Sequence, residues 1–470
     1  MRGARTLIAW LAGLVCAGTL PGVCAAAAPP PAASLSKPAV QTPLLDPFFD
    51  DLEKRTFSFF WDSANPANGL IPDRYPGPSW SSIAGVGFAL TAYPIGVERG
   101  YVTRDAARDR ALATLRFFAA ETEKHGFFYH FLDMKDGERR NHSEVSTVDT
   151  ALLLAGVLMS ESYFDGKDAK EREIRRLAEK IYRRVDWTWA EPFSAGLVMG
   201  WTPESGFIHA TWDGYDEAML VYILALGSPT HAVNPQAWKA WTSTYDKHWG
   251  TQYGETDLSF GPLFGHQYSH VWVDFRAIQD AYMRSRGLDY FENSRRATYV
   301  QQRYAIENPM HWQGYGPNIW GLTACEGPGR GSQIYDGQPR RFYGYAARGV
   351  GLDGSLDDGT IAPTAAIGSL PFAPEIVIPA TLEMYKRYGG SIYSTYGFRD
   401  SFNPSYQRGA QASKSGWVDE HYLAIDQGPI LAMIENYRSE LVWRIMRHND
   451  YIRRGLERAG FEGGWLQKNP

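Results

Sequence analysis

The sequence predicts an all-α fold, because apolar residues recur at helical spacing from one end of the 470-residue chain to the other. The helical segments also alternate in character, with almost wholly apolar ones followed by amphipathic, charged ones. A helix that is apolar on every side is buried, whereas an amphipathic helix shows one face to water. This alternation predicts an inner ring of buried helices inside an outer ring, a single (α/α)6 toroid. An irregular α-solenoid is the alternative, but no fixed sequence period appears, which argues against a simple repeat array.

The helices are predicted in order along the chain, and Thr103 is a good N-cap for the third of them. Apolar helices are expected over 82–100, 146–164 and 216–226, and their amphipathic successors over 103–124, 167–185 and 235–248. Further helices are expected over 46–62, 270–286, 289–307, 378–388, 427–436 and 439–459.

Four long segments between the helices are rich in Gly, Pro and aromatic residues. They span 62–81, 187–215, 308–375 and 389–426. Loops of this length in a compact domain are usually functional. Short runs at 197–201 and 208–211 predict minor β-hairpins. We expect these loops to gather at one mouth of the toroid and to form the active site.

The N-terminal residues predict a cleaved signal peptide over 1–25. Arg2 and Arg5 precede a short apolar run over 7–17, and the small residues at 23–25 supply a cleavage signature. The apolar run has about 11 residues, too few to span a bilayer. We therefore expect export to the periplasm, with no integral membrane span in the mature chain.

The rest of the chain predicts one large domain. An Ala/Pro-rich leader spans 26–45, and no linker or low-complexity run interrupts residues 46–470. Cys16 and Cys24 fall in the signal peptide, which leaves Cys325 as the single thiol of the mature chain. One thiol forms no internal disulfide, so core packing must stabilise the exported protein.

Composition narrows the class of ligand. The formal charge is −5 and no basic block stands out, which disfavours nucleic acid as a partner. Aromatic residues make up 14% of the chain, with 16 Trp and 27 Tyr. Flat rings with a polar edge suit the CH-rich faces of sugars, so this content favours a carbohydrate ligand. The sequence lacks HExxH and CxxC motifs, and no metal or other cofactor is predicted.

Two groups of carboxylates stand where buried helices begin. Ser146 and Asp149 have the spacing of a capping box, so Asp149 has a structural interpretation beside a catalytic one. Glu144 stands in the preceding loop and has no capping role. In the second group, Asp216 and Glu217 point about 100° apart, so only one of them faces the centre of the ring. A carboxyl buried among aromatic rings has a raised pKa, as a general acid requires.

Other polar and aromatic clusters lie at helix boundaries and in the long loops. Asp and Arg beside Trp are typical of sugar subsites, although an Arg next to an Asp is more often an ion pair that fixes a loop. The candidate substrate-binding residues are Trp212, Asp213, His270, Trp272, Asp274, Glu326, Arg399, Asp400, Trp417 and Asp426.

Seven blocks are specific enough to compare with known families. They span 57–61, 143–154, 215–231 (YDEAMLVYILALGSPTH), 318–328, 360–375 (TIAPTAAIGSLPFAPE), 396–403 and 425–438 (IDQGPILAMIENYR). Their content and order over residues 46–460 resemble a bacterial family often described as putative glucoamylases, which includes the endo-β-1,2-glucanases of glycoside hydrolase family 144. The resemblance implies an (α/α)6 toroid that hydrolyses β-1,2-glucan by an inverting mechanism without metal.

The resemblance also assigns expected roles. It implies that Glu217 is the general acid and that Glu144 or Asp149 acts from the opposite side of the pocket. Asp400 and Asp426 lie in matching blocks and are expected to be sugar contacts or members of a proton relay. The resemblance does not distinguish endo from exo action on the glucan. A glucan-modifying transglycosylase of the same fold and a non-catalytic periplasmic glycan-binding protein stay open as alternatives.

Overall fold

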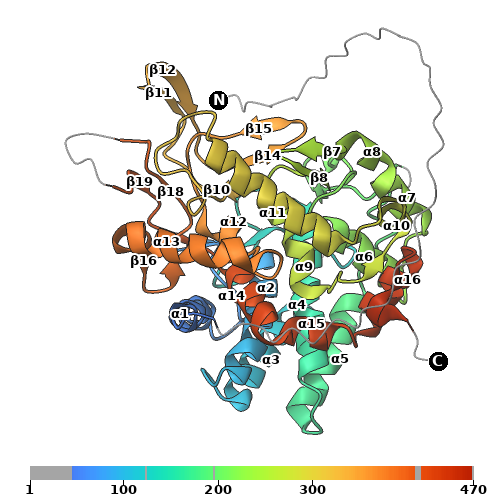
Figure 1. The fold of residues 1–470 in the computed structure, drawn as a ribbon. Helices are drawn as coiled ribbons and strands as arrows, with labels where there is room; N and C mark the ends of the chain where they lie inside the picture. The colour runs from blue at the N-terminus through green and yellow to red at the C-terminus, as the bar shows by residue number, and fades with distance from the viewer. Residues whose placement is uncertain (1–44, 122–123, 194–195, 408–413, 468–470) are drawn as a thin grey trace, which may run out of the picture. The chain divides into compact units, whose positions relative to one another are not determined.

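The computed structural model of the protein describes residues 45–121, 124–193, 196–407 and 414–467 (Figure 1). These residues belong to one compact unit, Leu44–Pro470. The predicted signal peptide and the leader up to residue 44 lie outside the described residues. Across the described ranges, no helix combines the length and the apolar character that crossing a membrane requires.

The unit is predominantly helical, as predicted. Side-chain caps fix several helix starts: Thr103 accepts the N–H of Ala106 at 3.2 Å, and Asp289 accepts that of Glu292 at 2.7 Å. The helices are α1 (Phe48–Ser63), α2 (Ile83–Glu98), α3 (Arg104–Ala120), α4 (Thr147–Tyr163), α5 (Ala169–Arg183), α6 (Met219–Gly227), α7 (Gln236–Trp241), α8 (Tyr245–His248), α9 (Tyr268–Trp272), α10 (Ala281–Arg286), α11 (Tyr290–Glu307), α12 (Pro363–Ile367), α13 (Pro374–Ile392), α14 (Ala424–Ser439), α15 (Leu441–Met446) and α16 (Asp450–Arg458), with 3-10 turns η1 (Thr242–Thr244), η2 (Leu263–His266) and η3 (Gly464–Leu466).

The described strands are short and antiparallel, and they pair two by two except in the three-stranded sheet β4–β5–β6. In Figure 1 the pairs β7–β8, β11–β12 and β14–β15 lie on the upper side of the helices. The strands are β1 (Arg74–Tyr75), β2 (Ser81–Ser82), β3 (Phe131–Leu132), β4 (Val145–Ser146), β5 (Gly200–Thr202), β6 (Gly206–Phe207), β7 (Trp249–Gln252), β8 (Glu255–Leu258), β9 (Ile278–Gln279), β10 (Ala324–Cys325), β11 (Gly331–Tyr335), β12 (Gln338–Phe342), β13 (Ala346–Ala347), β14 (Gly349–Gly351), β15 (Gly354–Leu356), β16 (Tyr393–Ser394), β17 (Gly397–Phe398), β18 (Phe402–Asn403), β19 (Trp417–Val418), β20 (Tyr422–Leu423) and β21 (Glu462–Gly463).

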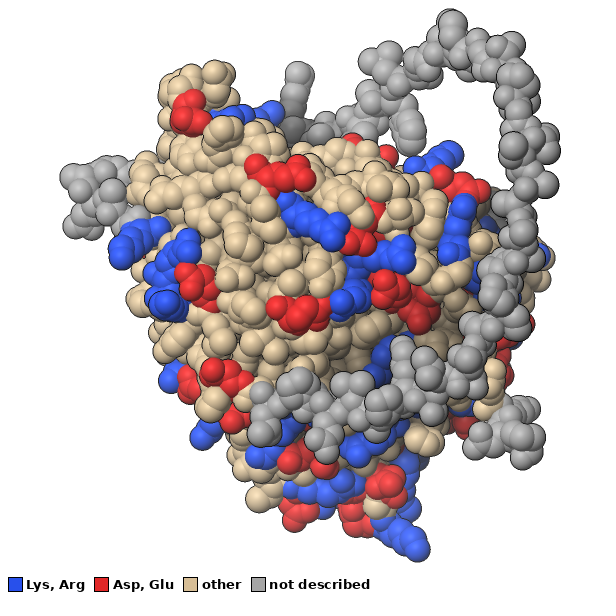
Figure 2. Space-filling model, viewed as in Figure 1, with Lys and Arg blue, Asp and Glu red and all other residues tan. Residues whose placement is uncertain are grey.

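The predicted alternation of buried and exposed helices is confirmed. Helices α2, α4, α6 and α14 are buried on nearly every side, whereas α3 and α5 bury one face and show the other to water. Figure 1 shows α3 and α5 projecting at the lower edge, and the face in Figure 2 carries Lys, Arg, Asp and Glu interspersed there. The apolar stripes of the outer helices therefore cover the inner ones.

The buried helices approach one another closely because small residues meet at their crossings. A Cβ atom added to Gly156 of α4 would overlap the backbone of Gly87 in α2, and one added to Gly87 would overlap Leu152. The crossing of α6 and α16 is built in the same way, because Gly455 lies against the backbone of Ile223. Only glycine fits the space at these positions, although its helix propensity is about 1 kcal/mol below that of alanine.

One predicted helix, 270–286, is broken in the structure. Asp274 accepts the backbone N–H of Arg276 at 3.1 Å and binds its guanidinium, which competes with helical hydrogen bonding. Ala277 then adopts the left-handed region with φ 59°. Asp280 starts a new helix, α10, by accepting the N–H of Met283 at 2.9 Å.

Other boundaries also differ from the sequence expectation. The run 439–459 divides into α15 and α16, because Asn449 caps α16 by accepting the N–H of Ile452 at 3.2 Å. The run 235–248 divides into α7, η1 and α8, and the short helix α12 lies within a segment expected to be loop. The predicted hairpin strands 197–201 and 208–211 meet through the bridge of Val198 with Thr211 and the pair β5–β6.

Gly156→Ala is expected to lower the free energy of unfolding by about 1–3 kcal/mol, because the new methyl group meets backbone that cannot rotate away. Gly390→Ala is the matched control: Gly390 lies at the exposed end of α13, with open space around its added methyl group. That control should be neutral or slightly stabilising. Chemical denaturation of both variants measures the difference, and equal effects would contradict the packing argument.

Candidate active site

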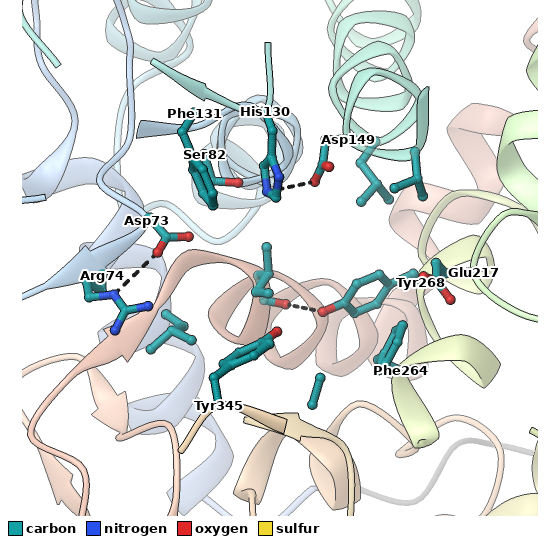
Figure 3. A pocket seen from close by; sticks show the side chains of 15 residues that line it. Asp73, Arg74, Ser82, His130, Phe131, Asp149, Glu217, Phe264, Tyr268 and Tyr345 are labelled. Atoms are coloured by element: carbon teal, nitrogen blue, oxygen red, sulfur yellow. Dashed lines mark hydrogen bonds and ion pairs between the residues drawn. The ribbon is translucent and has the colours of Figure 1, made fainter. Parts of the chain in front are cut away.

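A pocket of about 330 Å³ lies where three buried helices begin (Figure 3). Ser82 is the N-cap of α2, Asp149 lies in the first turn of α4, and Ile425 lies in the first turn of α14. Glu217 stands two residues before α6. The residues that line the pocket are Asp73, Arg74, Ser82, His130, Phe131, Val148, Asp149, Leu152, Glu217, Phe264, Tyr268, Ala324, Tyr345, Leu423 and Ile425.

Short strands bring distant segments to this pocket. In the pair β1–β20, Arg74 lies opposite Leu423, and in the pair β2–β3, Ser82 lies opposite Phe131. Strands β2, β4 and β20 each run directly into a buried helix, so each ladder fixes where that helix starts. Three of the four long loops predicted to be functional reach the pocket, and the segment 187–215 does not contribute a lining residue.

Asp149 makes half of the predicted capping box. Ser146 accepts the N–H of Asp149 at 3.2 Å, as expected for a helix N-cap. The reciprocal bond is missing, because the N–H of Ser146 donates to the carbonyl of Phe128 at 3.1 Å. The Asp149 carboxylate instead accepts the hydroxyl of Ser146 at 2.5 Å and faces the pocket. Its side chain is therefore available for chemistry.

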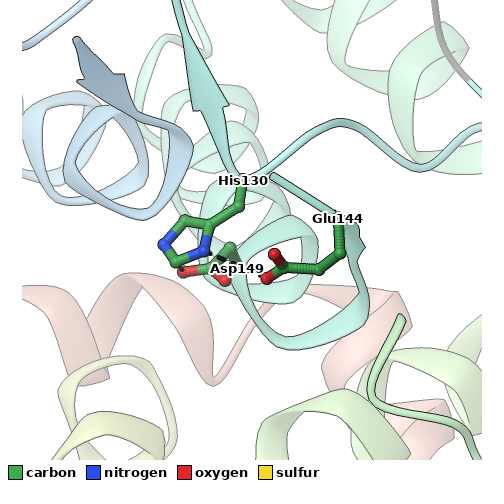
Figure 4. A group of neighbouring side chains, drawn as sticks. All are labelled: His130, Glu144 and Asp149. Atoms are coloured by element: carbon green, nitrogen blue, oxygen red, sulfur yellow. Dashed lines mark hydrogen bonds and ion pairs between the residues drawn. The ribbon is translucent and has the colours of Figure 1, made fainter. Parts of the chain in front are cut away.

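His130 lies between two carboxylates (Figure 4). Its Nδ1 is 3.1 Å from Glu144 Oε1, and its Nε2 is 3.5 Å from Asp149 Oδ1. Burial opposes a charge on the ring, but Asp149, Glu144 and Asp73 outweigh it and raise the pKa of His130 to about 9. Burial alone would raise the pKa of Glu144, but the contact with His130 outweighs it and lowers that pKa.

The same three residues are the candidates for holding a metal ion. Among the described residues, His130, Glu144 and Asp149 are the one group whose ligand atoms all lie within 4.8 Å of one another. The carboxylates, however, face different nitrogens of the ring, and one ion binds only one of those nitrogens. The geometry is that of an imidazolium paired with two carboxylates.

Glu217 lies across the pocket from Asp73 (Figure 3). Burial, together with the charge of Asp149, raises the pKa of Glu217 to about 7. Its buried Oε2 atom has no hydrogen-bond partner among the described residues. Asp216, by contrast, accepts the N–H of Ala218 at 2.8 Å and lines a separate cavity, so the two neighbours do face different directions.

The edge of the pocket opposite Glu217 is charged. Arg74 Nη1 lies 2.8 Å from Glu326 Oε1, and Arg74 Nε lies 3.4 Å from Asp73 Oδ2. Burial raises the pKa of Asp73, although Arg74 and His130 act against it. This network joins β1 to the segment that follows β10. Glu326, a predicted sugar contact, binds the lining residue Arg74 but does not itself line the pocket.

Asp400 and Asp426 are buried behind the lining residues. Asp400 accepts the N–H of Glu326 at 2.8 Å and the hydroxyl of Ser401 at 2.9 Å. Burial raises the pKa of Asp400 to about 7, and burial together with Asp400 raises that of Asp426. Neither residue lines the pocket, so the predicted direct sugar contact is not supported; a part in proton relay stays a prediction.

One ion pair anchors the loop that carries Tyr345. Arg348 and Asp358 are both fully buried, and the guanidinium nitrogens Nε and Nη2 lie 2.7 and 2.8 Å from the Asp358 carboxylate oxygens. Arg348 Nη1 also donates to the carbonyl of Cys325 at 2.7 Å. The pair therefore ties β10 to the segments on both sides of β14 and β15. Tyr345, 52% exposed, lines the pocket beside this anchor.

Several predicted sugar contacts are instead structural, which corrects the sequence expectation. His270 and Trp272 are fully buried, with side chains bonded to Ser294 at 3.1 Å and Thr91 at 2.8 Å. Asp274 is buried in ion pairs with Arg276 and Arg447. The side chains of all three residues lie in apolar or ion-paired surroundings away from the pocket. The sequence prediction was wrong because a motif next to Trp does not reveal which side of a helix faces the pocket.

The remaining candidates lie outside the pocket lining. Trp212 donates from Nε1 to Thr147 at 3.0 Å and so supports the start of α4. Asp213 lines the cavity that Asp216 faces. Trp417 pairs with Asn403 in β18–β19 and packs on the cluster around Trp312, and Arg399 has no place in the pocket.

Sequence reasoning missed several lining residues. His130, Asp73 and Tyr345 lie in loops, and Arg74, Phe264 and Tyr268 lie in a two-residue strand, a 3-10 turn and the first residue of a short helix, all without a recognisable motif. Three of them, Asp73, Arg74 and Tyr345, lie in the long loops 62–81 and 308–375. The length of these loops was the signal in the sequence that pointed to them. His130 stands alone between two helices, and only strand pairing places it beside Glu144 and Asp149.

A helical fold whose pocket sets a protonated carboxyl opposite ionised carboxylates has the arrangement of acid/base hydrolytic proteins such as glycoside hydrolases. The chain belongs to the family described as putative glucoamylase, which matches residues 209–450, just over half of the chain. The predicted family is confirmed.

Solved structures and a curated relative support the same family assignment. A putative glucoamylase from Bacteroides uniformis is 31% identical with a TM-score of 0.79, covering 89% of this chain and 98% of that one. An endo-β-1,2-glucanase from Chitinophaga pinensis, in complex with sophorotriose and glucose, is 29% identical with a TM-score of 0.77, at 89% and 98% coverage. An exo β-1,2-glucooligosaccharide sophorohydrolase from Parabacteroides distasonis is 29% identical over 443 residues. The match covers 87% of this chain and only 57% of that relative.

Glu217→Gln is expected to stabilise the protein at pH 8 but not at pH 4. An unfolded glutamate ionises near 4.5, whereas Glu217 keeps its proton up to about pH 7. Ionisation therefore destabilises the folded state, and this penalty is fully present above pH 7. Removing it should raise the free energy of unfolding by about 1–3 kcal/mol at pH 8.

Urea denaturation at both pH values measures this effect. Glu307→Gln, at the exposed end of α11, is the control. Its free energy of unfolding relative to wild type should be the same at pH 4 and pH 8. A Glu217→Gln variant that is equally stable relative to wild type at both values would contradict the raised pKa.

Proposed function

We propose that the protein is a glycoside hydrolase that cleaves β-1,2-glucan by an inverting acid/base mechanism. One observation carries the proposal: Glu217, with a pKa of about 7, shares a pocket with the His130–Asp149 pair, and His130 also contacts Glu144, which is not itself a lining residue. The names of the glucanase from Chitinophaga pinensis and the sophorohydrolase from Parabacteroides distasonis support the β-1,2 linkage. Because the chain spans 57% of the latter, its activity as a whole is part of the proposal.

In this mechanism Glu217 protonates the glycosidic oxygen of the bound glucan. It keeps its proton near neutral pH because burial opposes its charge. Glu144 or Asp149 steers water onto the opposite face of the sugar, directly or through a substrate hydroxyl. Inverting pairs stand about 6.5–9.5 Å apart to leave room for that water. Phe264, Tyr268 and Tyr345 line the pocket and offer ring faces to the sugars.

The buried helices close into an (α/α)6 toroid, with α2, α4, α6, α9, α12 and α14 as the inner ring. Contacts between α2 and α4, α4 and α6, α6 and α9, α12 and α14, and α14 and α2 support this closure. Gln267, at the start of α9, donates to the carbonyl of Ala365 and to Ser369, each at 2.8 Å, and so links α9 to α12.

Export to the periplasm fits this function. The sequence of residues 1–25 supports a cleaved signal peptide, and residues 46–470 would then be a single catalytic domain. The mixed charges in Figure 2 and the net charge of −5 give no support for a nucleic-acid partner.

Linear β-1,2-glucan is expected to be cleaved faster than laminarin, cellulose or starch by the purified protein. Chromatography of early products separates the remaining options. Sophorose released from the start indicates exo action, a spread of lengths indicates endo action, and products longer than the substrate indicate transglycosylation. Faster cleavage of starch, or binding without any cleavage, would contradict the proposal.

Glu217→Gln is expected to lower turnover at least about 10²-fold, because it keeps the shape of the side chain but removes the transferable proton. Glu307→Gln should retain wild-type turnover. NMR of the wild-type reaction should show the α anomer first, since inversion of a β linkage gives α product. Near-normal turnover in Glu217→Gln, or β anomer formed first, would overturn the assignment.

A further inference from the structure

His130 is held in place by its backbone as well as by its ring. Its N–H donates to the carbonyl of Glu144 at 2.9 Å, and its carbonyl accepts the N–H of Ile83, the first residue of α2, at 3.2 Å. Phe131 stacks on the ring with centroids 3.8 Å apart. The ring therefore has a defined orientation that does not depend on its ionic contacts alone.

Three carboxylates from three elements act on this ring. Asp149 comes from α4, Glu144 from the segment before β4, and Asp73 from the segment before β1. The nearby cations are already engaged: Arg139 binds Glu204 at 2.6 Å, and Arg74 binds Glu326 at 2.8 Å. His130 is therefore the cation that both Glu144 and Asp149 contact.

Glu217 has the opposite environment. Among the described residues, no Lys, Arg or His forms an ion pair with it, and its Oε2 atom lacks a hydrogen-bond partner. The pocket thus has one wall where Asp149 is paired with His130, a cation that Glu144 also contacts from outside the lining, and one carboxyl, that of Glu217, that is left unpaired. Two carboxyl groups in one site take acid and base roles when their surroundings differ in this way.

We infer that His130 is a positioning residue that makes the two sides of the pocket different: as an imidazolium between Glu144 and Asp149, it keeps that wall ionised and oriented to act on water, opposite the protonated Glu217. The inference rests on the proposed hydrolysis. His130 is not itself the proton donor, because both of its N–H groups face carboxylates and neither is free to reach a glycosidic oxygen.

The first test needs no substrate. In the full chain labelled at histidine, NMR should show the His130 ring protonated through pH 8 and titrating at about pH 9. Loss of the signal in His130→Gln identifies it, and Asp149→Asn should move its midpoint to lower pH. A midpoint near 6.5, or no response to Asp149→Asn, would overturn the inference.

The second test is the pH profile of kcat/KM on β-1,2-glucan. His130→Gln keeps an uncharged donor in the place of Nε2, towards Asp149, and His130→Asn keeps one in the place of Nδ1, towards Glu144. Both should move the acid limb upward by about one pH unit, because an opposite charge at this range lowers a carboxyl pKa by about 1–3. At pH values below the acid limb kcat should fall about tenfold, because a shift of one pH unit lowers the ionised fraction of the carboxyl tenfold there, with KM little changed.

His231→Gln, an exposed histidine on the turn after α6, is the matched control and should keep the wild-type profile. An unchanged acid limb in folded His130 variants would overturn the inference. If neither variant folds, the histidine NMR signal that shifts in Asp149→Asn identifies the His130 ring. The titration midpoint of that signal in the wild-type protein then tests the inference. A wild-type protein that cleaves no β-1,2-glucan would refute the proposed function, but the substrate-free titration would still report on His130.

Discussion

The backbone contact between Gly87 of α2 and Gly156 of α4 constrains much of the structure. Because neither residue has a side chain, the two helices pack nearly backbone to backbone. Their N-terminal ends are consequently brought together, and those ends carry Ser82 and Asp149 into one pocket. The strand pair β2–β3 sets Phe131 opposite Ser82, which puts the neighbouring His130 beside Asp149.

In this pocket, a buried and unpaired carboxyl group serves the proposed function but lowers the stability of the protein. Glu217 is buried without a cation, an arrangement that destabilises the ionised protein but leaves a proton available near neutral pH. Glu144 is kept ionised by His130 at a distance of 3.1 Å. Burial acts to raise the pKa of both carboxyl groups, and the cation paired with Glu144 reverses the direction for that residue alone.

The sequence predicted most of the fold. Helical spacing located α1 to α6, α11 and the core of α14, because each is long and strongly periodic. It failed at 270–286 and 439–459, where Asp274 bonds to the backbone N–H of Arg276 after α9 and Asn449 caps the start of the separate helix α16. Such bonds compete with helical ones in a way that periodicity does not register.

The sequence by itself determined the helical class and the family, and it singled out two carboxylates that line the pocket, Asp149 and Glu217, since these follow from local spacing and from motifs contiguous in the chain. Only the tertiary structure decided that His130 joins Asp149 and Glu144 and that Tyr345 lines the pocket. It also decided that His270 and Trp272 belong to the core. The physical reason is that pKa values and contacts depend on neighbours brought together by strand pairing and helix crossings, and the order of residues does not specify which side of a helix those neighbours occupy.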